Sequence, residues 1–385
     1  MCADWRVPLS DLDFDVEEEA AALRVLRGRW LTMGPEVEAF ESEFAQLLGV
    51  RHALAVASAT AALHLVYLAL DAGPTDEIIQ PGINFVAAAN MTLAVGATPV
   101  FADIVGLAEP TISPREIEQR ITARTKAVVV MHYGGFLCRM DEIATMCRDR
   151  GVALIEDACH AVGARYEGGA GGPLHNRMVG ALGDVACFSF FSNKNLATGE
   201  GGMITTNRDD IAERLRLLRS HGMTALTWDR HKGHAASYDV RLHGYNYRLD
   251  ELHAAIGRAQ LRKLGRNNER RRALAALYTR YLQPLTGWTI PFAELEGDSA
   301  HHLMVLVAPD EESRQRVVDA LRAERIQSSL HYPYVPGFSA FKRFDAGDGA
   351  HGRSFAQRTI TLPLYPTMTA AQVEDVCAVI RAAAC

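Results

Sequence analysis

The sequence predicts an α/β protein with a mainly parallel sheet of seven strands in a large domain, followed by a small α+β domain. Between about residues 52 and 206, short apolar runs alternate with helix-like segments. These runs are apolar at successive positions, which indicates strands buried on both faces, as in parallel sheets. Beyond about residue 250 a long helical stretch and a few shorter elements replace this pattern. We therefore expect a large domain over residues 1–250 and a small C-terminal domain over residues 251–385.

Each expected element follows from its apolar pattern and from the residues that flank it. The seven expected strands are His52–Val56, Glu77–Gln80, Thr98–Ala102, Lys126–Met131, Val152–Glu156, Val185–Phe190 and Gly202–Thr206. Helices are expected between several of them, at Ala61–Leu70, Arg115–Ile121 and Met140–Arg150. The C-terminal part is expected to contain a helix from Asp250 to about Leu282, a strand at His302–Val307, a helix at Glu311–Glu324, an extended segment at Ser328–Tyr332 and a helix at Ala370–Ala384.

Composition narrows the class of protein. The chain has 385 residues, of which 48% are hydrophobic, enough for a sizeable core. Its net charge of -6 offers no general attraction to nucleic acid or to anionic membranes. The N-terminal sequence resembles no signal peptide, and no apolar run is long enough to span a bilayer. The seven cysteines are scattered and have no metal-binding spacing, so we expect reduced thiols in a cytoplasmic protein without a metal.

A lysine and an aspartate carry the most specific chemical signal. Lys194 follows an apolar run and precedes the glycine-rich turn Thr198–Gly202, while Asp157 follows the expected strand Val152–Glu156. A lysine amine that forms a Schiff base and a carboxylate that pairs with a pyridinium nitrogen are the minimum equipment for pyridoxal phosphate chemistry. The chain contains only five lysines, and only Lys194 stands in such a loop. A plainer interpretation is that Glu156 or Asp157 caps the next turn, as carboxylates commonly do.

Further residues around these two fit the same cofactor. Ser58 and Thr60 begin an expected helix, where free amides and hydroxyls bind anions, although hydroxyl residues there are commonly simple caps. Ser189 is a second candidate for a phosphate. His160 is a candidate for the phenolic oxygen and Phe85 for stacking on the ring, although a buried histidine and a core aromatic are the usual roles of such residues. Each residue is a weak signal alone, whereas their order and spacing together are specific.

On these residues the chain resembles the DegT/DnrJ/EryC1/StrS family of PLP-dependent sugar aminotransferases, which have the fold-type-I architecture. The resemblance extends nearly end to end, and its motifs are specific as a set. They are Thr32–Glu41, Ser58-Ala-Thr60, Glu156-Asp-Ala-Cys-His160, Phe188-Ser-Phe with Lys194-Asn and Gly199-Glu-Gly-Gly202, Gly244-Tyr-Asn-Tyr-Arg248, and His331-Tyr-Pro333.

The resemblance implies a role for each matching residue. Lys194 falls on the Schiff-base lysine, Asp157 on the partner of the pyridinium nitrogen and His160 on the residue near the phenolic oxygen. The other cofactor contacts it implies are Thr60, Ala61 and Ser189 at the phosphate, Phe85 against the ring, and Asn246 at the phosphate of a neighbouring subunit. Asn246 therefore implies a homodimer with shared active sites. Two departures are Ser-Ala-Thr in place of the more frequent Ser-Gly-Thr, and Phe-Ser-Asn before Lys194, where the acceptor enters.

The resemblance also implies the reaction. An amino donor, L-glutamate or L-glutamine, loads the cofactor as pyridoxamine phosphate, and a keto sugar then receives the amino group, with Lys194 moving the proton. The family's sugar 3-dehydratases carry histidine at the position of Lys194, which argues against that activity. A non-catalytic PLP-binding regulator is disfavoured because Lys194 and Asp157 are both present and no DNA-binding domain is added.

The acceptor is the least determined part of this prediction. The segment His221–Arg241 gathers cationic and aromatic side chains, among them Arg230 and Lys232, that would suit a nucleotide diphosphate. A solvated surface loop explains the same composition equally well. We assign Arg230, Lys232 and Tyr332 to substrate binding and expect a nucleotide-linked keto-deoxyhexose, with a cyclitol ketone or another natural-product ketone as the alternative.

Overall fold

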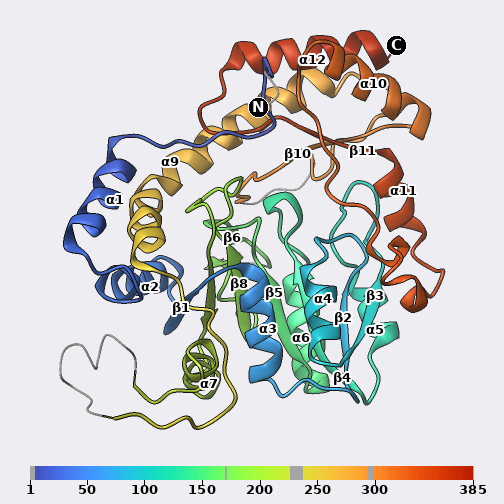
Figure 1. The fold of residues 1–385 in the computed structure, drawn as a ribbon. Coiled ribbons are helices and arrows are strands. Elements are labelled where there is room, and N and C mark those ends of the chain that lie inside the picture. The colour runs from blue at the N-terminus through green and yellow to red at the C-terminus, as the bar shows by residue number, and fades with distance from the viewer. Residues whose placement is uncertain (1–4, 170, 226–236, 294–297, 385) are drawn as a thin grey trace.

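A computed structural model gives the fold (Figure 1) and describes residues 5–169, 171–225, 237–293 and 298–384. A seven-stranded sheet lies at its centre, in the order β1-β9-β8-β5-β4-β2-β3. β5, β8, β4, β2 and β3 pair in parallel, whereas β9 runs antiparallel to both of its neighbours, β1 and β8. The predicted α/β class with a mainly parallel seven-stranded sheet is therefore confirmed.

The strands agree with the sequence prediction to within about one residue at each end. They are β1 (His52–Val56), β2 (Glu77–Pro81), β3 (Thr98–Ala102), β4 (Thr125–Met131), β5 (Ala153–Asp157), β8 (Val185–Ser189) and β9 (Gly202–Thr206). A short hairpin of β6 (Arg165–Tyr166) and β7 (Arg177–Met178) lies between β5 and β8 in the chain. Asp157 is the last residue of β5 rather than the first residue after it.

Helices cover both faces of this sheet (Figure 1). Those of the large region are α1 (Val16–Gly28), α2 (Pro35–Leu48), α3 (Ala59–Ala69), α4 (Ala87–Ala94), α5 (Pro114–Arg120), α6 (Met140–Arg150) and α7 (Asp209–Arg219). Side chains on one face of the strands pack with α3, α4 and α7, and those on the other face pack with α2, α5 and α6. Leu154 and Ile155 of β5 belong to different clusters, because successive strand residues point to opposite faces.

The long helix α9 (Glu251–Leu282) connects this sheet region to the C-terminal part of the chain (Figure 1). Leu264 packs in a core cluster of the sheet, whereas Leu274 and Tyr278 pack in a separate C-terminal cluster. The C-terminal elements are β10 (Met304–Val307), α10 (Glu311–Ala323), α11 (Ala350–Arg358), β11 (Thr359–Leu362) and α12 (Ala370–Ala384). Val7 also packs in that cluster. The division at residue 250 stays a prediction.

Glu156 holds the end of β5 in place. Its side chain is fully buried, and its two carboxylate oxygens accept hydrogen bonds from the backbone N–H groups of Gly180, Leu182 and Gly183 at 2.8–3.1 Å. The Nε2 atom of His132 lies 3.1 Å from the same carboxylate. These bonds tie β5 to the turn that leads into β8. Since both oxygens face N–H donors, an amide at this position would place its own N–H group against another donor.

We therefore expect Glu156→Gln to lower the free energy of unfolding by roughly 2–4 kcal/mol, because at least one buried donor loses its acceptor. Equilibrium unfolding in urea measures this difference. Glu142→Gln is the matched control, because Glu142 is exposed on α6, and its effect should stay within about 0.5 kcal/mol. Equal stability of the two variants would contradict a structural role for the Glu156 carboxylate.

Candidate active site

A cavity of about 410 Å³ lies where β5 and β8 end. This is the edge at which open α/β sheets bind their ligands. Eight of the residues predicted from the sequence line it, namely Ser58, Thr60, Phe85, Asp157, His160, Ser189, Lys194 and Tyr332. They come from segments separated by more than a hundred residues, and the fold brings them to one place.

Strand geometry selects Asp157, rather than Glu156, for this cavity. Asp157 shares a face of β5 with Ile155, on the side of α3 and α4, while Glu156 points to the opposite face. The same alternation on β8 places Ser189 on the face of Cys187, which packs in that cluster. One oxygen of Asp157 accepts a hydrogen bond from the N–H group of Cys159 at 3.3 Å. Asp157 therefore also caps the turn that follows β5, whereas Glu156 binds the segment that leads into β8.

Lys194 is placed by a tight turn and by its neighbour Asn195. Its backbone N–H donates to the carbonyl of Phe191 at 2.9 Å. Asn195 is buried and donates from its amide to the side-chain oxygen of Asn268 at 2.9 Å and to the carbonyl of Ala300 at 2.7 Å. Its remaining oxygen accepts from Nδ1 of His302 at 3.0 Å. The residue after the lysine is thus fixed by three hydrogen bonds.

The electrostatic surroundings favour a neutral amine on Lys194. Burial lowers its pKa below the ordinary value, and the nearby Cys159 and Asp157 oppose that shift only in part. A neutral amine is the form that attacks a carbonyl carbon, and it is the form that removes a proton. Burial likewise holds the pKa of His160 and His302 well below the usual histidine value, so both rings are neutral at physiological pH.

The N-terminus of α3 forms the anion-binding end of the cavity. Ser58 caps the helix, and its hydroxyl oxygen accepts from the N–H group of Ala61 at 3.1 Å. Gly202 of β9 packs so closely here that a Cβ atom on it would lie 2.7 Å from the carbonyl carbon of Ser58. Thr60 and Ser189 add hydroxyl groups to the cavity wall. The positive end of a helix dipole and free hydroxyls are what a phosphate group needs.

Aromatic rings form another wall of the cavity. The ring of Phe85 is 56% exposed and lies 6.0 Å from that of Tyr332. Tyr332 stacks on His160 with ring centroids 5.7 Å apart, and its hydroxyl lies 2.8 Å from Nε2 of His160. A large exposed aromatic surface beside a lysine and a carboxylate suits a flat ring.

Of the other four predicted site residues, two do not line the cavity and two lie outside the described residues. Ala61 contributes its N–H group to the cap of α3 and is not among the residues that line the cavity. Asn246 is exposed, pairs with Ser220 in a β-bridge, and does not line the cavity of its own chain. Arg230 and Lys232 lie outside the described residues.

Sequence reasoning missed several residues that line the cavity, above all Asn84 and Asn193. The Nδ2 atom of Asn84 and the Oδ1 atom of Asn193 are buried without a hydrogen-bond partner among the described residues. The other end of the Asn84 side chain accepts from the N–H group of Phe85 at 2.7 Å, so its amide donor points away from the backbone. Asn84 lies three residues beyond the end of β2, and that position was the available signal.

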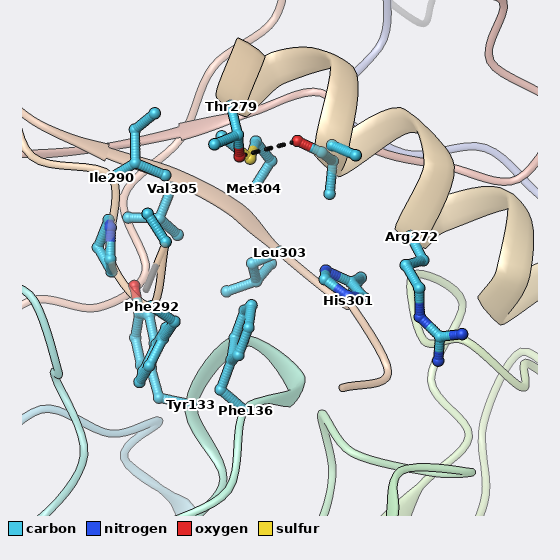
Figure 2. Close-up of a pocket in the computed structure, with 15 residues that line it drawn as sticks. Tyr133, Phe136, Arg272, Thr279, Ile290, Phe292, His301, Leu303, Met304 and Val305 are labelled. Atoms are coloured by element: carbon cyan, nitrogen blue, oxygen red, sulfur yellow. Dashed lines mark hydrogen bonds between the residues drawn. The ribbon is translucent and has the colours of Figure 1, made fainter. Parts of the chain in front are cut away.

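A second cavity, of about 330 Å³, lies between α9, β10 and the loop at Tyr133–Gly135 (Figure 2). Its walls are largely apolar, with Phe136 and Phe292 stacked 4.3 Å apart. The guanidinium group of Arg272 pairs with Asp298, and the hydroxyl of Thr279 donates to the carbonyl of Ala275 at 3.1 Å. Among the described residues, no lysine lines this cavity. Of these two cavities, the first therefore combines a lysine with a carboxylate.

The model of the DegT/DnrJ/EryC1/StrS aminotransferase family matches residues 13–381. The chain belongs to this family. The spore coat polysaccharide biosynthesis protein SpsC of Bacillus subtilis is 38% identical to this aminotransferase over 375 residues, which are 95% of this chain and 94% of SpsC. The solved structure of DesV from S. venezuelae is 35% identical and superposes with a TM-score of 0.88, covering 98% of each chain. DesI, solved in the presence of its TDP-sugar product, is 28% identical with a TM-score of 0.86, covering 99% of this chain and 93% of DesI.

The predicted family, the fold-type-I architecture and the class of enzyme are thereby confirmed, and this aminotransferase is PLP-dependent. The cavity fits the cofactor, since it combines an amine, a carboxylate, an exposed aromatic face and a helix N-terminus closed by Gly202. When bound, pyridoxal phosphate supplies an aldehyde that accepts an amino group and a ring that withdraws electrons. In the described part of the chain, no helix is both long and apolar enough to cross a membrane.

Proposed function

We propose that this aminotransferase transfers an amino group from L-glutamate or L-glutamine to a nucleotide-linked keto sugar, most simply a keto-deoxyhexose, in amino-sugar or natural-product biosynthesis. The observation that carries the proposal is the cavity in which the Lys194 amine and the Asp157 carboxylate lie together. The sugar acceptor is supported by SpsC, which is named for polysaccharide biosynthesis, and by DesI, which was solved with a TDP-sugar product.

Each of the side chains that line the cavity has a separate role in this proposal. The amine of Lys194 would hold the cofactor covalently and, when free, would move a proton at the α-carbon of the amino donor. The carboxylate of Asp157 keeps the ring nitrogen protonated, which stabilises negative charge on the neighbouring carbon. Thr60, Ser189 and the N-terminus of α3 would hold the phosphate, and Phe85 would cover one face of the ring.

We also propose that two copies of the chain share each active site. Asn246 is exposed and does not line the cavity of its own chain, and a second copy would allow the phosphate contact that the family resemblance implies. Apolar side chains are exposed in the same molecule, including Leu23, Leu26 and Leu31, and also Phe85 and Phe191 at the cavity. Burial of such side chains in a dimer would stabilise the assembly.

The first prediction concerns Lys194. Reduction with borohydride should fix the cofactor to Lys194 alone, and peptide mapping reads the position. Lys263 is the natural internal control, because its ammonium group is engaged with Glu18 at 2.7 Å and Asp15 at 2.9 Å. Lys194→Ala should lose the label, retain noncovalent cofactor and fail to transaminate. A label on Lys126, Lys232, Lys263 or Lys342 would refute the assignment.

The second prediction concerns the acceptor. Enzyme loaded with an amino group from glutamate should recover its original absorbance with a nucleotide-linked 4-keto-6-deoxyhexose. A nucleotide-linked 3-keto sugar and scyllo-inosose are offered separately. Arg230→Ala or Lys232→Ala should raise the Michaelis constant for the nucleotide sugar about ten- to a hundred-fold, the effect of losing one charge-assisted hydrogen bond.

The glutamate half-reaction should not change in these variants, because the amino donor carries no diphosphate. Arg322→Ala is the control for loss of a surface cation, since Arg322 is exposed on α10. Recovery with scyllo-inosose alone, together with silent Arg230→Ala and Lys232→Ala variants, would rule out the nucleotide sugar and establish the cyclitol ketone.

The third prediction concerns assembly. When Lys194→Ala chains are mixed with Asn246→Ala chains, each heterodimer should contain one intact site and one site with both defects. Activity at limiting cofactor should therefore rise above that of either parent as subunits exchange. Heterodimers can be isolated with two different affinity tags. If they show no such gain in activity, Asn246 acts in the active site of its own chain.

A further inference from the structure

The second cavity has a polar end and an apolar end. Figure 2 shows His301 and Arg272 on one side of it, and Phe292, Ile290 and Val305 on the opposite side. Its volume of about 330 Å³ lies within the range of small-molecule sites, and a cavity of roughly 150 Å³ already holds a benzene ring. The space therefore suits a ring that carries a short polar arm.

Arg272 gives the polar end its charge. Among the described residues that line this cavity, none is acidic. The guanidinium group is partly exposed on α9, and its Nη2 atom forms an ion pair with Asp298. Its other nitrogens have no hydrogen-bond partner in the described part of the chain. A guanidinium group has five N–H donors, so Arg272 can bind a carboxylate while it keeps its contact with Asp298.

His301 provides a neutral donor beside this charge. Burial lowers the pKa of its ring to about 4, so the ring is uncharged at physiological pH and offers one N–H group. Neither ring nitrogen is hydrogen-bonded to another described residue. The backbone φ of His301 is 43°, a left-handed value that is uncommon outside glycine, and the hydroxyl oxygen of Ser299 accepts from its N–H at 3.0 Å. Such conformations cluster at binding and catalytic sites.

The apolar end is built from aromatic and aliphatic side chains. The rings of Phe136 and Phe292 are stacked with their centroids 4.3 Å apart, and the ring of His301 meets Phe136 edge-on at 5.2 Å. Met304 and Val305 of β10 are buried and line the same space. Because His301 touches this apolar wall, one small molecule can contact the wall and the polar end together.

We propose that the second cavity binds a small carboxylate with an apolar body, of the arylalkanoate class. The carboxylate accepts hydrogen bonds from Arg272 and His301. The ring of the ligand lies against Phe292 and Val305, where its burial removes apolar surface from water.

This site is separate from that of transamination. The loop at Tyr133–Gly135 lies between the two cavities, since Tyr133 lines the second one while the N–H of Gly134 donates to Nδ1 of His160 at 3.3 Å in the first. A ligand within the second cavity is thus on the far side of this loop from Lys194. The inference goes beyond the proposed function and does not depend on where the cofactor binds.

The probe is 3-(4-fluorophenyl)propionate, and fluorine nuclear magnetic resonance follows its binding to the holoenzyme. A ligand of about a dozen heavy atoms is expected to bind with a Kd of about 0.1–1 mM. The matching alcohol, 3-(4-fluorophenyl)propan-1-ol, lacks the negative charge and should bind about ten-fold more weakly. Propionate lacks the ring, and it should compete with the probe at least about ten-fold more weakly.

Four variants locate the site on α9. Arg272→Gln should weaken binding of the probe about ten-fold, and loss of its exposed ion pair with Asp298 should hardly change stability. The alcohol should bind this variant as it binds the unmodified enzyme, because it makes no charge-assisted contact. Ala276→Trp fills part of the cavity and should weaken binding of both molecules more than about ten-fold. Arg270→Gln and Ala273→Trp are the matched controls and should stay within about twofold, because both residues are exposed on α9 and do not line the cavity.

Three results would overturn the proposal. Equal affinities for the acid and the alcohol, or unchanged binding of the acid by Arg272→Gln, would make the cavity a site for neutral apolar molecules. Unchanged binding by Ala276→Trp would place the probe elsewhere on the molecule. Displacement of the probe by L-glutamate, at concentrations near the Michaelis constant for glutamate, would place it in the first cavity.

Discussion

The alternation of side chains at the end of β5 is the constraint on which the site depends. Two adjacent carboxylates leave the strand on opposite faces, and each finds a different environment. Glu156 is surrounded by backbone N–H groups and becomes part of the scaffold, whereas Asp157 enters the cavity and remains available to a ligand. A slip of one residue in the pairing of β5 with β4 and β8 would exchange the two roles. The hydrogen bonds of Glu156 oppose that slip. The buried carboxylate of Glu156 therefore keeps the carboxylate of Asp157 in the cavity.

Neutral buried polar groups surround the lysine. His160, His302 and Tyr332 all have pKa values displaced by burial toward their uncharged forms. Their hydrogen bonds therefore orient neighbouring groups without adding a formal charge beside Lys194. In such a medium the charge of Asp157 acts over a short distance with little screening. The neutral hydrogen-bonding groups therefore fix the geometry of the cavity, while a charged cofactor would set the electric field within it.

The strands and the central site residues could be predicted because both depend on short sequence patterns. Apolar runs gave the strands to within about a residue, and the order of Thr60, Asp157, Ser189 and Lys194 indicated the cofactor. The antiparallel direction of β9 was not predictable in this way, since a buried strand has the same composition in either direction. The contact between His160 and Tyr332 joins residues 172 positions apart and depends on the turn at Gly134, which no local pattern encodes. Asn84 was missed because an isolated asparagine after a strand is usually a turn residue.

Residues around the cavity differ in how firmly they are packed, and this difference bears on the choice of acceptor. The groups proposed to handle the cofactor lie on strand ends, on a helix N-terminus and in the buried network around Asn195, where packing fixes them. Phe85 and Phe191 at the cavity are instead exposed, with 56% and 46% of their surface accessible. A ligand or a second subunit that covered these two rings would bury apolar surface that folding leaves exposed, so that burial energy is available to binding. The proposed dimer would thus complete the wall that the acceptor meets, and changes in that wall would alter the substrate while the interior chemistry stayed the same.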